Sequence, residues 1–136
     1  MTATDGTVTV RHVDGNGTWL VALHGEHDAF TVPHLAERTE VVWSRSTHAI
    51  IDLSDAQFID SSVIGWVLRA RTHADARRIV LVEGSASIAN RVLDVTGLRD
   101  IFPCYPCLED ALGADPHDEP HGAVVLPDRG IPTADS

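Results

Sequence analysis

The sequence predicts a single α/β domain: a mixed β-sheet of about five strands, opened by a β-hairpin and packed with about four α-helices. Two observations support this fold class. Strand-like and helix-like segments alternate from residue 48 onward, which is typical of parallel strands joined by helices. Before them, two segments rich in β-forming residues flank a short turn sequence, which is typical of an antiparallel pair. With 136 residues, the chain has room for one compact core of this kind.

The hairpin is predicted from two segments near the start of the chain. Residues 7–13 alternate with period two, and residues 18–24 are apolar and rich in β-forming types. Between them, residues 14–17 read Asp-Gly-Asn-Gly, residue types that favour tight turns. The two segments are therefore expected to pair as antiparallel strands.

A helix and a central strand are predicted next. Thr31 is a suitable helix cap, and Pro33 suits the first turn of a helix. Apolar residues at helical spacing follow as far as residue 43, and we expect this helix to end near Ser46. Residues 48–53 are short and largely apolar, as expected for a strand that is covered on both faces of the sheet.

A second helix is predicted from Ser61, where apolar residues recur as one helical stripe: Val63, Ile64, Val67 and Leu68. Residues 78–82 are the next strand. A third helix is expected from Ser85, with Ile88, Val92, Leu93 and Val95 as its apolar residues and Gly97 as its left-handed cap.

The last elements of the domain are short. We predict an edge strand within residues 101–105 and a short helix at 108–112. The domain is therefore assigned to residues 1–113. Residues 114–136 contain four prolines and several acids but only a brief apolar patch, and we expect them to form a flexible tail.

Composition argues against several classes of partner. The formal net charge is −10 and the ten basic residues are scattered, whereas binding to nucleic acid depends on clustered Lys and Arg. No apolar run approaches the roughly 20 residues needed to cross a bilayer. The N-terminus shows no cationic start followed by an apolar stretch, so a cytoplasmic location is expected.

The most informative segment is residues 60–65, which read Asp-Ser-Ser-Val-Ile-Gly and open the second predicted helix. Here a serine hydroxyl lies at the positive end of a helix. A phosphate at that place would be stabilised by free backbone N–H groups and by the helix dipole, and it would add a charge of about −1.5 to −2. Because Asp and Ser are also the preferred cap residues, plain helix capping is the alternative interpretation.

With these residues the chain resembles the anti-sigma-factor antagonist branch of the STAS family. Residues 60–65 match the family's Asp-Ser-Ser-Gly-Leu-Gly box, residues 25–35 its Gly-Glu-Leu-Asp stretch and helix start, and residues 88–98 its third helix with a Gly-Leu ending. The resemblance covers about residues 7–112 and implies a STAS-type fold. Two positions depart from the family pattern: Val63 replaces the usual Gly, and His27 replaces the usual Leu.

The resemblance implies a binding switch. Such an antagonist binds an anti-sigma-factor serine kinase, releases a sigma factor, and is inactivated when the kinase phosphorylates the serine after the aspartate, here Ser61. Asp60 would orient the loop or the hydroxyl, and Ser62 would line the same helix start. Val63, a β-branched residue in the first turn, could alter how closely a kinase approaches the hydroxyl. A monomer or a weak homodimer is expected.

Three further residues are candidates for contacting the partner. The resemblance places Glu26 and Asp28 near the switch serine, where they would repel a phosphate or contact the partner; the alternative is that they are solvated loop carboxylates. Trp66 lies at the edge of the second helix's apolar stripe, where it would be either an interface anchor or a core residue.

Cys104 and Cys107 have the C-x-x-C spacing of dithiol redox sites, but only a short terminal segment follows them. With His117 and His121 they could also form a zinc site, although the linking chain lacks a zinc finger's apolar core. Free buried thiols in a reducing cytoplasm are the favoured interpretation.

Two alternative functions stay open. One is an unphosphorylated STAS adaptor within a signalling or lipid-transport assembly. The other is a serine-dependent hydrolase with Ser61 as nucleophile, although the chain has no Gly-x-Ser-x-Gly elbow. The favoured interpretation is a protein without catalytic activity, cofactor or metal.

Overall fold

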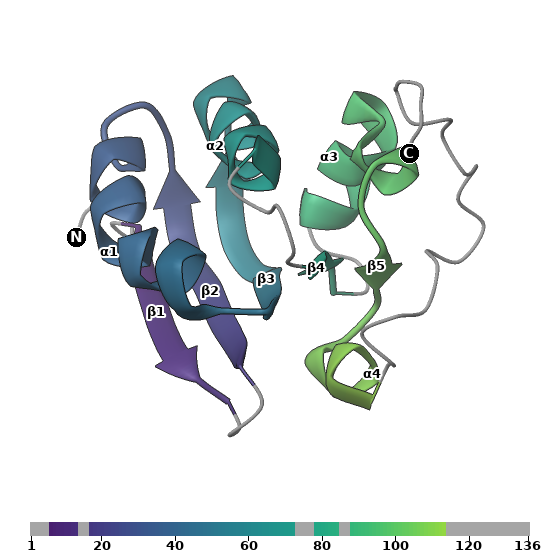
Figure 1. Ribbon diagram of the computed structural model, residues 1–136. Coiled ribbons are helices and arrows are strands. Elements are labelled where there is room, and N and C mark those ends of the chain that lie inside the picture. Colours follow the sequence, from purple (N-terminus) through teal and green to yellow (C-terminus); the bar gives the residue numbers. More distant parts are fainter. Residues whose placement is uncertain (1–5, 14–16, 73–77, 85–87, 114–136) are drawn as a thin grey trace, which may run out of the picture.

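In the computed structural model, a five-stranded sheet runs in the order β1-β2-β3-β4-β5 and carries four α-helices within the described residues (Figure 1). The structure describes residues 6–13, 17–72, 78–84 and 88–113. The strands are β1 (Thr7–His12), β2 (Thr18–His27), β3 (His48–Ile59), β4 (Arg78–Val82) and β5 (Cys104–Tyr105). The helices are α1 (Val32–Arg45), α2 (Ser61–Thr72), α3 (Ile88–Thr96) and α4 (Leu108–Gly113), with a 3₁₀ turn, η1 (Leu98–Asp100), after α3.

The sheet is mixed, as the sequence predicts. β1 pairs antiparallel with β2, and β2, β3, β4 and β5 follow in parallel. The opening hairpin is therefore confirmed. Gly17 has a φ of 88°, a left-handed conformation that suits glycine, and the Val13 N–H donates to the Thr18 carbonyl at 2.8 Å.

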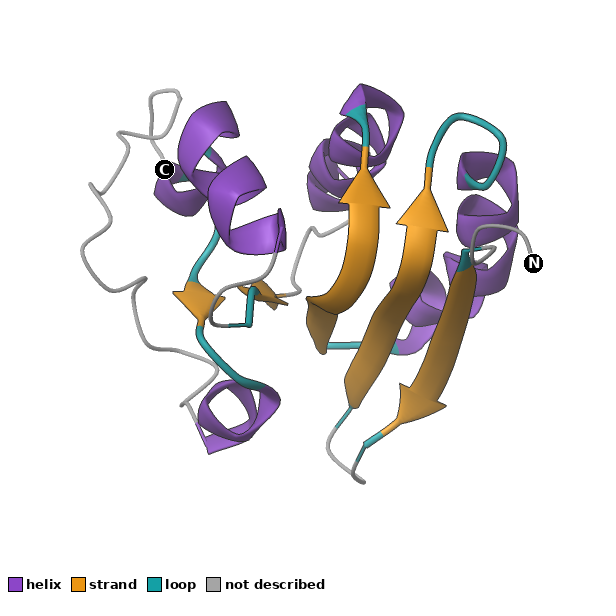
Figure 2. Ribbon diagram, turned by 180° about the vertical axis from the view of Figure 1, so that it is seen from behind, coloured by secondary structure: helices purple, strands orange, loops and turns teal. Residues whose placement is uncertain are grey.

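The two faces of the sheet are covered unequally. Side chains on one face, such as Leu23 and Ile51, pack with α1, α2 and α3 into the main core. The other face holds a smaller core in which Ile50 and Val80 pack with Ala111 of α4. Figure 2 shows β1, β2 and β3 from the side opposite α1 and α2. The strand predicted at 48–53 is central and buried on both faces, as expected.

Two strands are longer than the sequence predicts. β3 continues past Leu53 to Ile59, and β2 continues past His24 to His27. Polar residues interrupt the apolar pattern in both extensions, and the pairing of β2 with β3 shifts register twice there. The loop expected between strand and helix before Ser61 is therefore mostly strand, which fixes the serine close to the sheet.

The helix boundaries largely follow the predictions. Thr31 is the N-cap residue of α1, with Pro in the first turn and Ser46 at the C-cap, but the Thr31 side chain makes no capping bond. Gly97 is left-handed, with a φ of 78°, after α3. The predicted start at Ser85 and the tail at 114–136 lie outside the described residues. No helix in the described part of the chain is long and apolar enough to span a membrane.

Candidate functional site

Ser61 is the first residue of α2 and its side chain is exposed. The strand that leads to it ends at Ile59, which is buried in the main core, so the chain emerges from the core within two residues. Within the described part of the chain, the Ser61 hydroxyl forms no hydrogen bond. The oxygen is thus held at the surface with no internal partner.

Asp60 caps α2. Its Oδ1 accepts the backbone N–H of Ser62 at 2.9 Å and that of Val63 at 3.3 Å. Its carbonyl accepts the N–H groups of Val63 and Ile64 at 3.1 and 3.2 Å. Capping is therefore the structural role of Asp60, and it keeps the helix start in place without using the hydroxyl of Ser61.

This cap corrects one sequence-based expectation. A phosphate on Ser61 was expected to meet free backbone N–H groups, but those of Ser62 and Val63 already donate to the Asp60 carboxylate. In this conformation, a phosphate would lie beside a carboxylate that occupies these two donors. Its charge would therefore add to an anion already present at the helix start.

Val63 does not obstruct the hydroxyl. Its side chain is fully buried in the main core together with Val67, one helical turn later. Ser61 lies on the exposed side of the same turn. The departure from the family's glycine therefore fills the core and leaves the approach to Ser61 free of the Val63 side chain.

The end of β2 lies beside the end of β3, because His27 pairs with Ile59 in the parallel register. Glu26, the penultimate residue of β2, is exposed. Asp28 is half-buried and organises the following turn: its Oδ1 accepts the N–H of Phe30 at 2.9 Å and that of Thr31 at 3.3 Å. Glu26 is therefore available to a partner, whereas the Asp28 carboxylate is engaged within its own loop.

His27 is built into this loop. Its side chain is 1% exposed; Nε2 lies 3.1 Å from both the Thr7 and the His24 carbonyl oxygens, and Nδ1 lies 3.1 Å from the Thr31 hydroxyl. Two carbonyl acceptors require a proton on Nε2. The imidazole in place of the family's leucine thus ties β1, β2 and the loop before α1 together.

Phe30 was not singled out from the sequence. It follows Asp28 in the turn and its side chain is 91% exposed, the most exposed large apolar residue in the described part of the chain. The signal that could have identified it is an aromatic residue within a polar link between a strand and a helix. Such a link lies at the surface, where an aromatic side chain has no core to fill.

Trp66 belongs to the core. It is 3% exposed and its ring lies 6.4 Å from that of Trp43 in a tilted arrangement. Of the two interpretations drawn from the sequence, burial favours the core residue over the interface anchor.

Arg99, just beyond α3, anchors this helix to the end of β4. Its guanidinium pairs with the buried Glu83 and with Asp94 at 2.5 Å, and it donates to the Asn90 carbonyl at 3.1 Å. The hydrogen bond that Arg99 donates to the Glu83 carboxylate raises the pKa of Arg99 above its ordinary value, although partial burial opposes the shift. The charged network holds α3 in position relative to the sheet.

The two cysteines have different surroundings. Burial raises the pKa of the Cys104 thiol to about 12, so at neutral pH it stays protonated and is a poor nucleophile, whereas Cys107 is exposed. His117 and His121 lie outside the described residues. Among the residues that are described, no three metal-binding side chains cluster.

A groove runs from Ser61 between α2 and α3, with a volume of about 540 Å³. The described residues that line it are mostly aliphatic and include no histidine: Ile59, Asp60, Ser61, Ile64, Gly65, Leu68, Ile88, Arg91, Val92, Val95 and Thr96. The only base that could activate Ser61 from this lining is the Asp60 carboxylate, which already caps the helix. The geometry suits an apolar contact better than nucleophilic catalysis.

A family model described as the STAS domain matches residues 7–111. The chain therefore belongs to the STAS domain family. It is 33% identical over 115 residues to anti-sigma-F factor antagonist RsfB of Mycobacterium tuberculosis, a match that covers 82% of this chain and 92% of the relative. It is 30% identical over 98 residues to an anti-sigma-B factor antagonist of Staphylococcus epidermidis, covering 69% of this chain and 86% of the relative.

A solved structure shows the same arrangement. The crystal structure of an anti-sigma factor antagonist from Mycobacterium paratuberculosis superposes with a TM-score of 0.71 at 28% identity, covering 79% of this chain and 92% of that one. The predicted fold class and family are thus confirmed.

Proposed function

We propose that this chain is an anti-sigma-factor antagonist that binds an anti-sigma-factor serine kinase through the surface around Ser61 and thereby releases a sigma factor. Phosphorylation of Ser61 by the same kinase weakens the complex. The observation that carries the proposal is the exposed hydroxyl of Ser61 at the start of α2. The Asp60 cap holds the backbone there, and the hydroxyl itself forms no hydrogen bond to any described residue. The names of the two relatives support the class of partner.

The electrostatics of the site favour a switch in this direction. A phosphate on Ser61 would join the Asp60 carboxylate at the helix start and the exposed Glu26 at the neighbouring strand end. A charge introduced at a desolvated protein contact commonly costs about 2–5 kcal/mol, which is roughly 30-fold to several thousand-fold in affinity. A loss of affinity of this size is sufficient to shift the protein from the kinase-bound to the free state.

In this proposal the protein acts in the cytoplasm by binding and has no reaction of its own. The kinase supplies the chemistry: the γ-phosphoryl group of ATP passes to Ser61 Oγ, its bond to the β-phosphate oxygen breaks and ADP leaves, and the hydroxyl proton passes to a base of the kinase. The Val63 side chain is buried on the core-facing side of α2, which supports access of a kinase to this oxygen.

Intact mass measurement tests the proposal. The chain is incubated with purified anti-sigma-factor kinases from its own genome and ATP. One added phosphate is expected with the cognate kinase, lost in Ser61→Ala and retained in the matched control Ser62→Ala. A kinase that binds the chain tightly but adds no phosphate would favour the adaptor alternative, and a phosphate that persists in Ser61→Ala would place the switch elsewhere.

A further inference from the structure

Helices α2 and α3 each have a second apolar side that the core does not use. Val63 and Val67 of α2 and Ala89 and Leu93 of α3 are buried against the sheet. Other apolar residues of the two helices line the groove and stay accessible: Leu68 is 38% exposed, Ile88 36% and Val95 79%. Val92 is half-buried, as is Ile64, which also packs against the edge of the main core. An apolar surface of this kind, left open beside a candidate docking residue, is typical of an interaction site.

The groove is continuous with the surface of Ser61. Ser61, Ile64 and Leu68 follow one another along α2 at intervals of three and four residues, so they form one row on the helix. At about 1.5 Å per residue, this row is roughly 10 Å long, or about two helical turns. Any protein segment that covers the Ser61 hydroxyl therefore also reaches the near end of the groove.

Charges lie within this otherwise aliphatic lining. Arg91 of α3 supplies a cation, and Asp60 supplies an anion beside Ser61. A complementary segment would carry an acidic residue opposite Arg91 and a basic residue opposite Asp60, with aliphatic residues between them. Open, nearly apolar surroundings of this kind offer few of the convergent polar groups that orient a small ligand.

We infer that the α2–α3 groove receives the apolar face of an amphipathic helix of the anti-sigma factor, as a continuation of the contact at Ser61. This inference depends on the proposed function and specifies which element of the partner binds. The apolar rows on α2 and α3 recur about once per helical turn, which matches the i, i+3/i+4, i+7 spacing of the anchors of a helix bound in a groove. A phosphate on Ser61 then places an anion at the edge of a desolvated apolar contact, which opposes docking of the helix.

Titration calorimetry tests the inference. The full chain is titrated against its cognate anti-sigma factor, which is the kinase identified by the intact mass measurement. The informative variant is Val95→Glu, because a side chain that is 79% exposed can be changed without disturbing the core. The matched control is Leu112→Glu, which adds the same charge at a residue that is 44% exposed. Leu112 belongs to α4, a helix whose Ala111 packs with the opposite face of the sheet. Equal thermal midpoints of the two variants establish that both are folded.

The expected result is an affinity at least about tenfold weaker for Val95→Glu, with Leu112→Glu within about twofold of the unmodified protein. If Val95→Glu binds like the unmodified protein while Ser61→Asp binds weakly, the groove is overturned and the proposed function stands. If Leu112→Glu loses as much affinity as Val95→Glu, the loss reflects net charge and the groove is also overturned. Absence of binding by the unmodified protein to every anti-sigma factor of its genome overturns the proposed function itself.

Discussion

At the scale of single residues, the site divides its tasks between neighbours. Asp60 holds the start of α2 through two backbone N–H groups, and Val63 fixes the first turn to the core. Ser61, between them, contributes to neither and remains exposed. Because the structural roles belong to other side chains, Ser61 can be modified without the loss of a fold-stabilising contact.

Replacing Asp60 tests this division. Asp60→Ala removes the oxygen that accepts from Ser62 and Val63, and loss of such a cap typically lowers the free energy of unfolding by about 1 kcal/mol. Asp60→Asn keeps an oxygen acceptor in the same position and is expected to retain most of the stability. Urea denaturation followed by circular dichroism measures both. Equal losses in the two variants would show that the carboxylate charge, and not the cap, stabilises the helix.

At the scale of elements, the motif residues could be predicted because the cap and the helix start are local in sequence. The full length of β3 could not be predicted, since Ser54, Asp55 and Gln57 read as a loop and only pairing with β2 makes them a strand. For a similar reason the exposure of Val95 could not be predicted. Helical spacing places it among apolar neighbours, but it does not say whether another element covers that side of α3.

The position of α3 depends on Arg99. Arg99→Ala leaves the buried Glu83 without its guanidinium partner. We expect a loss of roughly 2 kcal/mol in the free energy of unfolding. This loss is below the range for a fully buried ion pair, because the pair of Arg99 and Glu83 is partly solvated. Chemical denaturation measures this loss, with Arg91→Ala on α3 as the control. In the double variant Arg99→Ala with Glu83→Gln, part of the stability should return, because no buried carboxylate charge is left without its guanidinium. An Arg99→Ala protein as stable as the unmodified chain would contradict the anchoring role.

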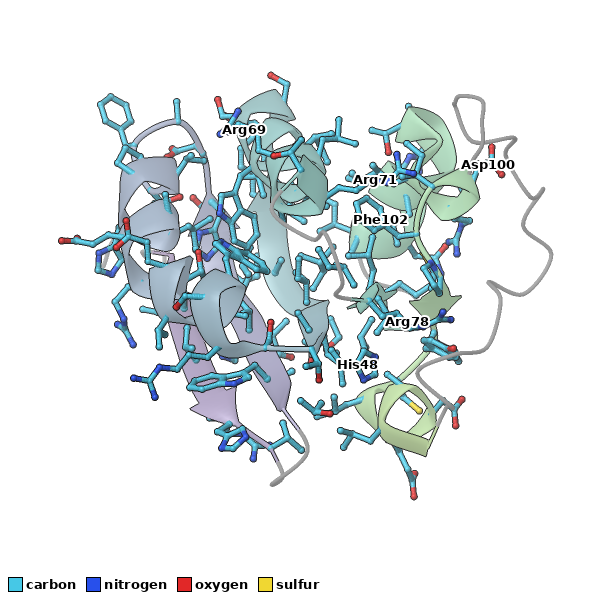
Figure 3. The ribbon with its side chains drawn as sticks, viewed as in Figure 1. His48, Arg69, Arg71, Arg78, Asp100 and Phe102 are labelled. Carbon is cyan, nitrogen blue, oxygen red and sulfur yellow. The ribbon has the colours of Figure 1, made fainter. Side chains whose placement is uncertain are left out.

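At the scale of the whole molecule, the candidate contact residues lie outside the main core. The main core lies between the sheet and three helices, whereas Ser61, Glu26 and Phe30 lie where strands end and chains turn (Figures 1 and 2). Figure 3 shows His48 and Arg78 on the side of the molecule where α4 lies. Strand and helix periodicity predicted the layers of the fold. The groove could not be predicted in this way, because it forms between two helices that are distant in sequence.

The proposed switch requires that Ser61 contacts the partner protein and that an anion at this position disrupts the contact. Calorimetry with the cognate anti-sigma factor tests this most directly, comparing the unmodified chain with Ser61→Ala and Ser61→Asp. The prediction is that Ser61→Ala binds as the unmodified chain does, because the Ser61 hydroxyl has no bond to any described residue. Ser61→Asp is expected to bind about 30-fold or more weakly. Equal affinity of the Ala and Asp variants would contradict the account.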